Sequence, residues 1–394
     1  MKILIVCEST YLYESGGRVV RYLTSILKNK HQVKIVVLAP KRDDFSLGNF
    51  YDKIDIEFLP IKKNVFSRII NLLFITNKLE KFRGILGEYK PEVVHFASFD
   101  HTKPAQFIKD AKTFGARVIL QPWTMHFYCT QGFGFRNNQQ CTLCASGNYY
   151  NALIQKCTTI RSIPSLIEKK ILHKQALKAD GFLSSNKGLD EILLKYGVNN
   201  KDIHRFPVPF DYNFLNNIQT KEDNYFIFYG QANEHKGLKV LLEVFRKIKK
   251  QKLQIHPIDY LSKNEFENTN IEVINNSSWT NGLKEAIANA KVIILPSLWN
   301  TSTEYAMCEA LLLKKPIIIF NVGVHKDVFT HKENAMVVEP NDIEGLKNAI
   351  IELDNDADLR IKIGSNGYKT LLKINNPKKL FLELNSAYMS PKFD

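Results

Sequence analysis

Apolar runs of strand length alternate with amphipathic stretches in the N-terminal half of the chain. The run Ile3–Val6 has the length of one buried strand, and apolar residues near Val19–Lys28 recur at the spacing of a helix face. Further runs of strand length are Val33–Leu38, Val93–Ala97, Arg117–Leu120 and Gly181–Ser185. Because strands that alternate with helices pair in parallel, we expect a parallel sheet in this half.

The same alternation starts again after a proline-spaced segment, Arg205–Asp211, which is typical of a domain linker. It includes the strand-like runs Tyr225–Gly230 and Val292–Leu295 and ends with an amphipathic stretch near Pro377–Tyr388. The predicted fold class is therefore α/β, with two Rossmann-like halves. The predicted domains are residues 1–206, residues 212–375, and a final helix over residues 376–394 that crosses back to the first domain.

Composition and charge narrow the classes of protein that fit. Hydrophobic residues make up 44% of the 394 positions and charged residues 24%, which is ordinary for a folded chain. No apolar run reaches the ~18 residues of a membrane span, and the first run is too short for a signal peptide, so we expect a cytoplasmic protein. The net charge of +14 indicates an acidic partner, either anionic lipid or a phosphorylated substrate. Nucleic acid is not expected, because the basic residues are dispersed and follow no nucleic-acid-binding motif.

One segment, Leu295–Ile319, combines the features of a ligand-binding turn. It contains a buried strand, a loop rich in hydroxyl side chains, a helix with Glu309, and a proline before the next strand. A loop that leads into a helix points unpaired backbone N–H groups at one place, which suits a diphosphate. An ordinary turn with Ser302 or Thr303 as the helix N-cap explains the same pattern.

Short motifs within this segment add a family resemblance. They are Pro-Ser-Leu-Trp from Pro296, Glu-Ala-Leu from Glu309, and Lys-Lys-Pro-Ile-Ile from Lys314. Together they resemble the donor-site signature of retaining GT-B glycosyltransferases, glycosyltransferase family 4. The stretches Asn321–Asp327 and Asn334–Asp342 are also similar to that family, and the similarity spans almost the whole chain.

The resemblance implies both a fold and a reaction. The fold would be GT-B, two Rossmann-like domains whose parallel sheets face each other across a cleft. The reaction would move a sugar from a nucleoside diphosphate sugar to a glycan or lipid-linked acceptor, with retention of anomeric configuration and without a required cofactor. Such enzymes serve the synthesis of bacterial-type cell-surface polysaccharides and glycolipids, so the protein is expected in the cytoplasm or on the inner face of the membrane.

The resemblance also implies donor contacts in the second half. Glu309 matches the second of two family glutamates, which implies hydrogen bonds between its carboxylate and the ribose hydroxyls. The first glutamate position falls on Thr301, a hydroxyl in place of a carboxylate, and Glu304 comes three residues later. Ser302 completes this part of the expected donor site, and backbone amides near Thr303 and Glu304 would stabilise the leaving group.

A second donor motif lies at Tyr229–Gly237, which resembles the family's Gly-Arg followed by Lys-Gly. Gly230 and Lys236 match it, and Lys236 would hold the donor diphosphate as a point charge. Gln231 stands where the family has arginine, so a neutral donor replaces a charged one. A solvated lysine at a helix start is the alternative for Lys236.

The first half contributes two further candidates. Gly16 and Gly17 follow the first strand and open a helix, so the backbone could approach a phosphate or sugar closely, although a glycine pair is more often a simple turn. Arg18 would add a charge there, or lie on the surface. His126 ends a Thr-x-His motif after a buried strand and resembles the family histidine of the catalytic cleft. A histidine with a purely structural role is the alternative.

Four cysteines lie in a polar insertion, residues 127–160. Cys141 and Cys144 are spaced as a metal knuckle, and Cys129 and Cys157 would complete a tetrahedral structural zinc site. A redox-active pair or free thiols remain open, because the flanking spacings are long.

Basic and apolar residues mix from Ile61 to Phe74 and continue to Lys78, Lys81 and Arg83. Such a segment can lie on an anionic membrane, where each nearby cation contributes about 1 kcal/mol. A helix that faces the core and carries solvated lysines is the alternative.

Other functions remain open at this stage. A degenerate GT-B scaffold would bind nucleotide, glycan or a partner protein without turnover, and Thr301 and Gln231 motivate it. A GT-B epimerase is another candidate. A phosphorylase would need a longer chain and a lysine that bears pyridoxal phosphate.

Overall fold

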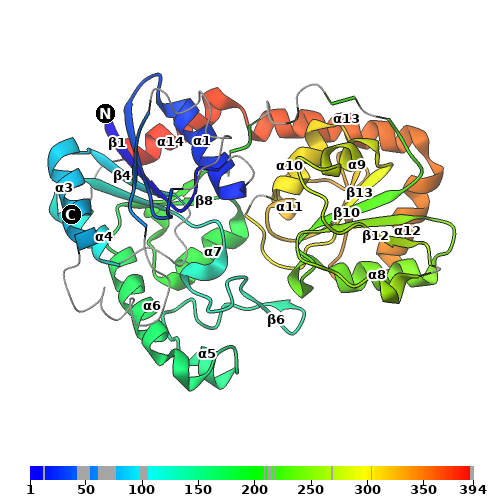
Figure 1. Cartoon of the computed structure of the whole chain (residues 1–394), viewed down its shortest axis with the longest axis horizontal. Helices are drawn as coiled ribbons and strands as arrows, with labels where there is room; N and C mark the ends of the chain where they lie inside the picture. Colours follow the sequence, from blue (N-terminus) through cyan, green and yellow to red (C-terminus); the bar gives the residue numbers. More distant parts are fainter. Residues whose placement is uncertain are drawn as a thin grey trace. The chain divides into compact units, whose positions relative to one another are not determined.

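The computed structural model describes most of the chain (Figure 1). The described residues are 1–11, 14–41, 54–60, 77–97, 105–207, 209–211, 215, 218–219, 221–267, 269–302 and 304–390. They form two compact units, and each is described by itself. Unit 1 comprises Met1–Gly134, Cys141–Pro209 and Pro377–Asp394, and unit 2 comprises Phe135–Gln140 and Phe210–Asn376.

Unit 1 is built on a seven-stranded sheet in which every pair is parallel. The strands from one edge to the other are β3 (Asp55–Phe58), β2 (Gln32–Val37), β1 (Lys2–Cys7), β4 (Val93–Ala97), β5 (Arg117–Gln121), β8 (Gly181–Ser184) and β9 (Ile203–Arg205). The central strands are buried along nearly their whole length, as expected for a parallel sheet that is covered on both faces.

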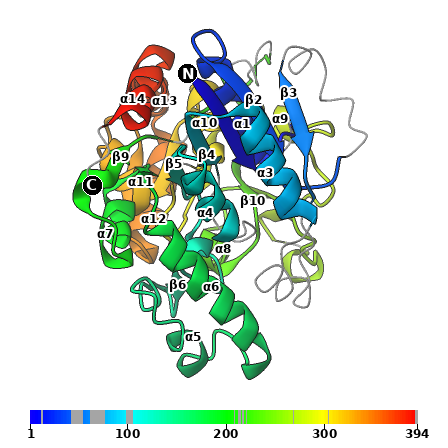
Figure 2. The same ribbon diagram turned by 90° about the vertical axis from the view of Figure 1, so that its left-hand side faces the viewer.

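Helices cover both faces of this sheet (Figure 2). The longer helices of unit 1 are α1 (Ser15–Leu27), α3 (Asn77–Tyr89), α4 (Ala105–Thr113), α6 (Ile163–Ala176), α7 (Lys187–Tyr196) and α14 (Pro377–Met389). The final helix α14 shares a core with β1 and α1, where Leu380 and Leu384 are fully buried. Arg117 on β5 donates from Nε to the Ala387 carbonyl at 3.0 Å, so the end of the chain is fixed to the sheet.

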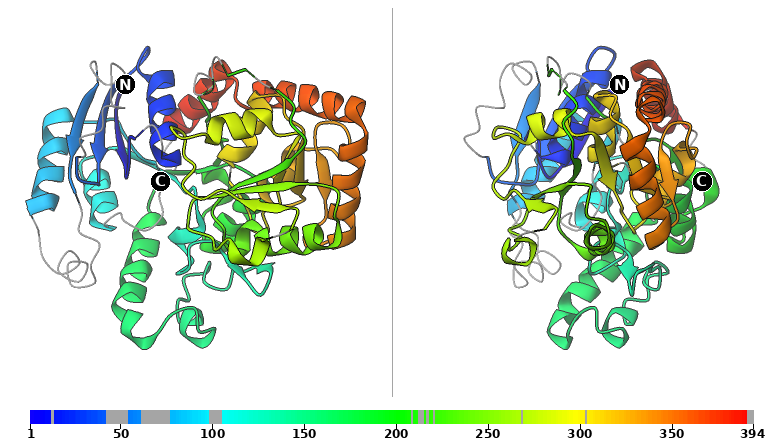
Figure 3. Two further views of the ribbon diagram at one scale, coloured as in Figure 1. Left: turned by 45° about the vertical axis from the view of Figure 1, so that its right-hand side comes forward. Right: turned by 90° about the vertical axis from the view of Figure 1, so that its right-hand side faces the viewer.

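Unit 2 contains a six-stranded sheet, also parallel throughout. Its order is β12 (Ile271–Val273), β11 (Leu253–Pro257), β10 (Phe226–Gly230), β13 (Val292–Leu295), β14 (Ile317–Phe320) and β15 (Met336–Val338). The helices are α8 (Leu238–Lys247), α9 (Leu283–Asn289), α10 (Tyr305–Leu312), α11 (Gly323–Val328), α12 (Ile343–Asn355) and α13 (Ala357–Ile374). Helices α8 and α12 pack on one face of the sheet, and α9 and α10 lie on the other (Figure 3).

A short hairpin, β6 (Phe135–Arg136) and β7 (Gln139–Gln140), groups with unit 2, because Phe135 packs against the core of that unit. The rest of the cysteine-containing insertion groups with unit 1. The chain passes between the units at four places, on either side of this hairpin and next to Phe210 and Asn376. The Asn375 side chain hydrogen-bonds both the N–H, at 3.0 Å, and the carbonyl oxygen of Phe210.

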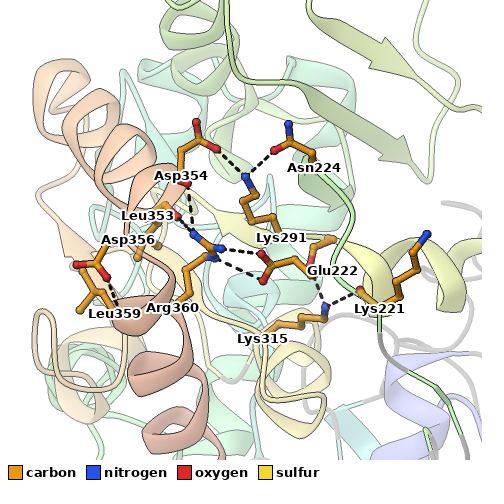
Figure 4. Close-up of polar contacts among 11 residues, drawn as sticks. Lys221, Glu222, Asn224, Lys291, Lys315, Leu353, Asp354, Asp356, Leu359 and Arg360 are labelled. Atoms are coloured by element: carbon orange, nitrogen blue, oxygen red, sulfur yellow. Dashed lines mark hydrogen bonds and ion pairs between the residues drawn. The ribbon is translucent and has the colours of Figure 1, made fainter.

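The amino-terminal edge of the unit 2 sheet is closed by a network of charged side chains (Figure 4). Arg360 on α13 contacts Glu222 at 2.6 Å, and Lys291 contacts Asp354 at 2.8 Å. Lys315 donates to the Ala290 carbonyl at 2.9 Å. The polar groups at this edge are therefore engaged with one another, and the loops at the carboxyl edge remain for a ligand.

Both sheets reverse their strand order once, between β1 and β4 in unit 1 and between β10 and β13 in unit 2. In open parallel sheets ligands bind at the carboxyl ends of the strands that flank this switch point. In the described part of the chain, no helix has the length and apolar character needed to cross a membrane.

Candidate functional site

Three loops meet at the carboxyl edge of the unit 2 sheet, after β10, β13 and β14. Two glycines permit their close contact. A Cβ on Gly237, whose φ is +72°, would lie 1.8 Å from the Pro296 carbonyl oxygen, and a Cβ on Gly323, whose φ is +51°, would lie 2.4 Å from the Thr301 nitrogen. Backbone bonds also join the loops, from Leu298 N–H to the His235 carbonyl at 2.8 Å and from Val324 N–H to the Thr301 carbonyl at 3.1 Å.

Glu304 is the centre of a charged cluster formed by these loops. Lys236 pairs with Oε1 of Glu304, and Ser297 donates to the same oxygen at 2.9 Å. Nε2 of His325 lies 3.4 Å from the other carboxylate oxygen. The cluster therefore combines residues from all three loops around one buried carboxylate.

The electrostatics of the cluster keep this carboxylate charged. Burial alone would raise the pKa of Glu304, but the charge of Lys236 and the hydrogen bond from His325 outweigh it and hold the pKa well below its usual value. Burial and the Lys236 charge lower the pKa of the neighbouring His235 to about 4. Lys236 also lies 5.8 Å from the centre of the Trp299 ring. Lys236 is thus held in place by a carboxylate and a ring, in contrast to the solvated lysine considered as the alternative.

The loop after β13 is buried over Asn300, Thr301 and Ser302. The side-chain amide of Asn300 is 4% exposed and makes no hydrogen bond within the described part of the chain. A buried polar group without a partner is uncommon in folded proteins and is a place where a ligand can be bound. Thr303 lies outside the described residues.

Glu309 is held away from solvent on α10, where it is 2% exposed. The Tyr229 hydroxyl lies 3.1 Å from its carboxylate and 2.9 Å from the Ala306 carbonyl oxygen. Tyr229 comes directly before Gly230 at the end of β10. The contact between Tyr229 and Glu309 therefore connects α10 to the end of β10, next to Gln231 in the sequence. The N-cap of α10 is Glu304 rather than Ser302 or Thr303, and its side chain makes no capping hydrogen bond because it is engaged by Lys236.

In unit 1 the predicted glycines have packing partners within the protein. A Cβ on Gly17 would lie 2.0 Å from the Tyr11 carbonyl oxygen, and one on Gly16 would lie 3.0 Å from the Trp123 ring. Gly17 is therefore required for the close approach of α1 to the Tyr11 backbone, whereas a side chain at Gly16 would need only a small shift of Trp123. A contact of either glycine with ligand stays a prediction. Arg18 is 4% exposed, so the alternative of a surface arginine is wrong.

His126 lies on a short 3₁₀ helix, Met125–Phe127, just after β5. Its Nδ1 is 3.0 Å from the Thr124 hydroxyl. A Cβ on Gly132, whose φ is +86°, would lie 2.0 Å from the ring, so the following loop packs directly on the imidazole. This fixes the orientation of the ring, and the catalytic role of His126 stays a prediction.

The cysteines of the insertion, Cys129, Cys141, Cys144 and Cys157, are half-buried and form no disulfide. Burial first, and then the three neighbouring thiols, raise the pKa of Cys144 to about 11. Cys144 and Cys157 both pack against a small core formed by Tyr149, Ala152 and Leu166. Within the described ranges, however, no group of three or more His, Cys, Asp or Glu side chains is arranged to hold a metal ion. Structural zinc stays a prediction.

The basic segment that was expected to lie on a membrane falls largely on residues 61–76, which lie outside the described residues. Lys78, Lys81 and Arg83 are on α3. Arg83 pairs with Asp110 on α4 at 2.9 Å.

The sequence of unit 2 matches a known family. Residues 213–370 fit the family model of glycosyl transferases group 1. This stretch contains all three loops of the charged cluster.

Among curated proteins, the chain is similar to UDP-Gal:alpha-D-GlcNAc-diphosphoundecaprenol alpha-1,3-galactosyltransferase from Escherichia coli, with 24% identity over 112 residues. That match spans 27% of this chain and 29% of the relative.

Solved structures show the fold over the whole chain. The Anabaena protein Alr3699/HepE, solved in complex with UDP and glucose, superimposes with a TM-score of 0.69 at 11% identity, covering 99% of this chain and 100% of its own. A glycosyltransferase from Rickettsia africae gives a TM-score of 0.67 at 16% identity, covering 99% and 98%. The α/β architecture with two parallel sheets is therefore the GT-B fold, as predicted.

Ser297, Asn300 and His325 were not singled out from the sequence as site residues. Ser297 and His325 lie inside motifs that were quoted for the family resemblance, so the motifs gave a signal. Asn300 gave no such signal, because a single asparagine in a polar loop is common and its burial is known only from the structure.

Proposed function

We propose that the protein is a glycosyltransferase that moves a sugar from a nucleoside diphosphate sugar, with UDP as the nucleotide, to a glycan or lipid-linked acceptor. The observation that supports this most strongly is the charged cluster around Lys236 and Glu304, in a segment that fits the model of glycosyl transferases group 1. The buried amide of Asn300, which has no hydrogen-bond partner among the described residues, lies in one of the same loops. The UDP complex of the Anabaena structure supports the choice of nucleotide. The Escherichia coli relative, named for a diphosphoundecaprenol acceptor, supports a lipid-linked acceptor.

In the proposed reaction, the bond between the anomeric carbon and the β-phosphate oxygen breaks, and UDP leaves with the bonding electrons. An acceptor hydroxyl oxygen bonds to the anomeric carbon and gives its proton to the departing phosphate oxygen of UDP. Negative charge grows on the diphosphate in this step, and Lys236 together with the N–H groups at the start of α10 would stabilise it. Glu309 would bind the ribose, and His126 would contact the transferred sugar. Retention of configuration is part of the proposal and rests on the family resemblance.

Lys236 is paired with Glu304, and this shapes the proposed donor binding. A diphosphate that approaches Lys236 would share the cation with a carboxylate, and the two anions would repel each other. We therefore expect the ammonium to bridge phosphate and Glu304, with Ser297 and His325 holding the carboxylate in place. This arrangement gives Lys236 a fixed position before the donor arrives, which lowers the cost of ordering it.

The experiment is a panel of UDP-, GDP-, ADP- and TDP-sugars, with thermal shift and nucleotide release measured side by side. Lys236→Ala should abolish both stabilisation and release, and Glu309→Ala should weaken both. Lys239→Ala is the matched control, because Lys239 is an exposed lysine on α8 three residues away. Stabilisation by UDP-sugars without release, even with lipid and glycan acceptors present, would favour a binding scaffold over an enzyme.

A structural zinc ion on Cys129, Cys141, Cys144 and Cys157 is a separate part of the proposal. The Cys-x-x-Cys spacing of Cys141 and Cys144 supports it, as does the packing of Cys144 and Cys157 against one small core. Binding would have to draw the four thiols together, since the described side chains are not arranged around a metal ion. Metal analysis of protein purified without chelator should give one zinc per chain. Cys144→Ser should lose it and Cys308→Ser, at a buried cysteine of α10, should keep it.

A further inference from the structure

Part of unit 1 projects from its sheet as an arm (Figures 1 and 2). The arm, residues 149–176, consists of α5 (Asn151–Ile154), the 3₁₀ turn Ile160–Ser162 and α6. It has a small core of its own, made by Tyr149, Ala152 and Leu166. At its base, Leu172 and Ala176 of α6 are buried, and α6 packs against α4.

Large apolar side chains remain exposed on the arm although its own core is filled. Their exposed fractions are 67% for Tyr150, 70% for Ile154, 77% for Ile160, 40% for Ile163 and 53% for Ile167. A single exposed isoleucine needs no explanation, but five large apolar side chains within eighteen positions form a concentration that indicates an interaction surface.

Along α6 the apolar surface changes to a basic one on the same helix face. Ile163, Ile167, Lys170 and Lys174 follow the spacing i, i+4, i+7 and i+11, which is one stripe of an α-helix. Lys170 and Lys174 are exposed. At 1.5 Å per residue, Lys170 lies about 10 Å along the helix from Ile163. The isoleucines could therefore reach the boundary between headgroups and acyl chains, which lies roughly 5–10 Å deep, while the lysines stay at the level of the headgroups.

The charge of this region is strongly positive. Residues 149–176 contain five Lys or Arg and a single acidic residue, Glu168. Lys156 and Arg161 are exposed beside the apolar tip. An apolar tip surrounded by cations complements a surface whose interior is hydrocarbon and whose headgroups are anionic.

We propose that the arm docks the protein on an anionic lipid bilayer, with Ile154, Ile160 and Ile163 inserted below the headgroups and the lysines of α6 at the phosphates. The inference deepens the proposed function, because a lipid-linked acceptor lies in such a bilayer. It is independent of nucleotide chemistry, since no residue of the arm belongs to the charged cluster of unit 2.

Sedimentation with lipid vesicles tests the proposal. The protein should bind vesicles of phosphatidylcholine mixed with phosphatidylglycerol and not vesicles of phosphatidylcholine alone. The double substitution Ile160→Glu with Ile163→Glu should weaken binding roughly tenfold or more, because two large side chains lose their burial. Lys170→Glu with Lys174→Glu should weaken it and remove much of its salt dependence. Ile361→Glu is the matched control, since Ile361 is 67% exposed on α13 of unit 2, and it should bind as the wild type does.

Insertion has its own readout. A tryptophan at position 160, from Ile160→Trp, should be quenched by brominated lipids, whereas one from Ile361→Trp should not. Undiminished vesicle binding by the Ile160→Glu, Ile163→Glu variant would overturn the proposal, as would the absence of binding by the wild type. If the wild type binds no vesicles but forms a dimer in solution, and this variant abolishes the dimer, then the arm binds a second copy of the chain and not a bilayer. UDP stabilisation measured on the same samples separates these outcomes from a failure of the proposed function.

Discussion

At the scale of single residues, Glu304 is held by three side chains, since Lys236, Ser297 and His325 all contact its buried carboxylate. Glu304→Gln removes the charge and leaves Lys236 without its partner. We expect the free energy of unfolding to fall by about 1–3 kcal/mol, a typical cost for a broken, largely buried charge pair with one partly exposed member.

Chemical denaturation of purified protein measures this loss. Glu285→Gln is the control, because Glu285 is an exposed glutamate on α9 of the same unit. An equal effect of the two substitutions would show that the cluster contributes nothing to stability.

The burial of His256 should make the protein less stable in mild acid. Burial lowers the pKa of His256 from 6.5 to about 4, and Glu272 opposes this only in part. Between these two values His256 is protonated in the unfolded chain but stays neutral in the folded unit. The free energy of unfolding is therefore unaffected by His256 above pH 6.5 and falls as the pH drops toward 4. The loss is on the order of 3 kcal/mol.

Melting temperatures across this pH range check the effect. His256→Gln should flatten the dependence on pH, whereas His331→Gln, at an exposed histidine, should leave it unchanged. A dependence that is equally steep in His256→Gln would assign the acid sensitivity to other groups, of which His235 is the first to test.

The sequence identified Lys236 and Glu309 through their motifs, but it did not predict that Glu304 would pair with Lys236. That pair joins loops sixty-eight positions apart, and it depends on how two strands are ordered in the sheet. Gly16 and Gly17 illustrate the same limit, because their close neighbours, Tyr11 and Trp123, are set by tertiary packing.

At the scale of elements, the turn before α8 depends on a glycine. Gly237 and Gly282 have nearly the same positive φ, +72° and +74°, but only Gly237 has a close neighbour, the Pro296 carbonyl oxygen. Gly237→Ala should therefore cost clearly more than the roughly 1 kcal/mol of backbone strain that Gly282→Ala shares with it. It should also weaken UDP binding, since the loop with Lys236 must move.

Chemical denaturation of both variants measures the two losses of stability: Gly282→Ala reports backbone strain alone, and Gly237→Ala reports strain together with the clash against Pro296. Thermal shift with UDP on the same variants measures donor binding. Equal losses of stability in the two variants would contradict this, because they would mean that the loop of Gly237 can move away from Pro296 at no cost in free energy.

The alternation of apolar and amphipathic segments predicted most strands and helices, since parallel strands buried on both faces leave continuous apolar runs, as in Val292–Leu295. The helix start at Tyr305 was less predictable. Ser302 and Thr303 are better N-cap residues than glutamate, but the loop geometry makes Glu304 the cap and directs its side chain to Lys236. The grouping of the β6–β7 hairpin with unit 2 also had no local signal.

For the whole molecule, the two-unit architecture followed from the α/β pattern that starts again after Arg205–Asp211, whereas the arm could not be anticipated. Residues 127–160 were described from the sequence as a polar insertion, and the exposure of five large apolar side chains between residues 150 and 167 is known only from the structure.

The proposed chemistry predicts that transfer does not depend on a divalent ion, because Lys236 and the start of α10 would supply the positive charge. Nucleotide release should be unchanged by EDTA and by added Mg²⁺. Loss of release in EDTA that Mg²⁺ restores would require a metal at the diphosphate instead.

The most direct test of the account is the mass of a lipid-linked acceptor after incubation with the protein and the UDP-sugar that stabilises it. The account predicts that the acceptor gains the mass of one sugar, that UDP is released in equal amount, and that Lys236→Ala gives neither. UDP-sugar binding with no gain in mass for any glycan or lipid-linked acceptor would contradict it.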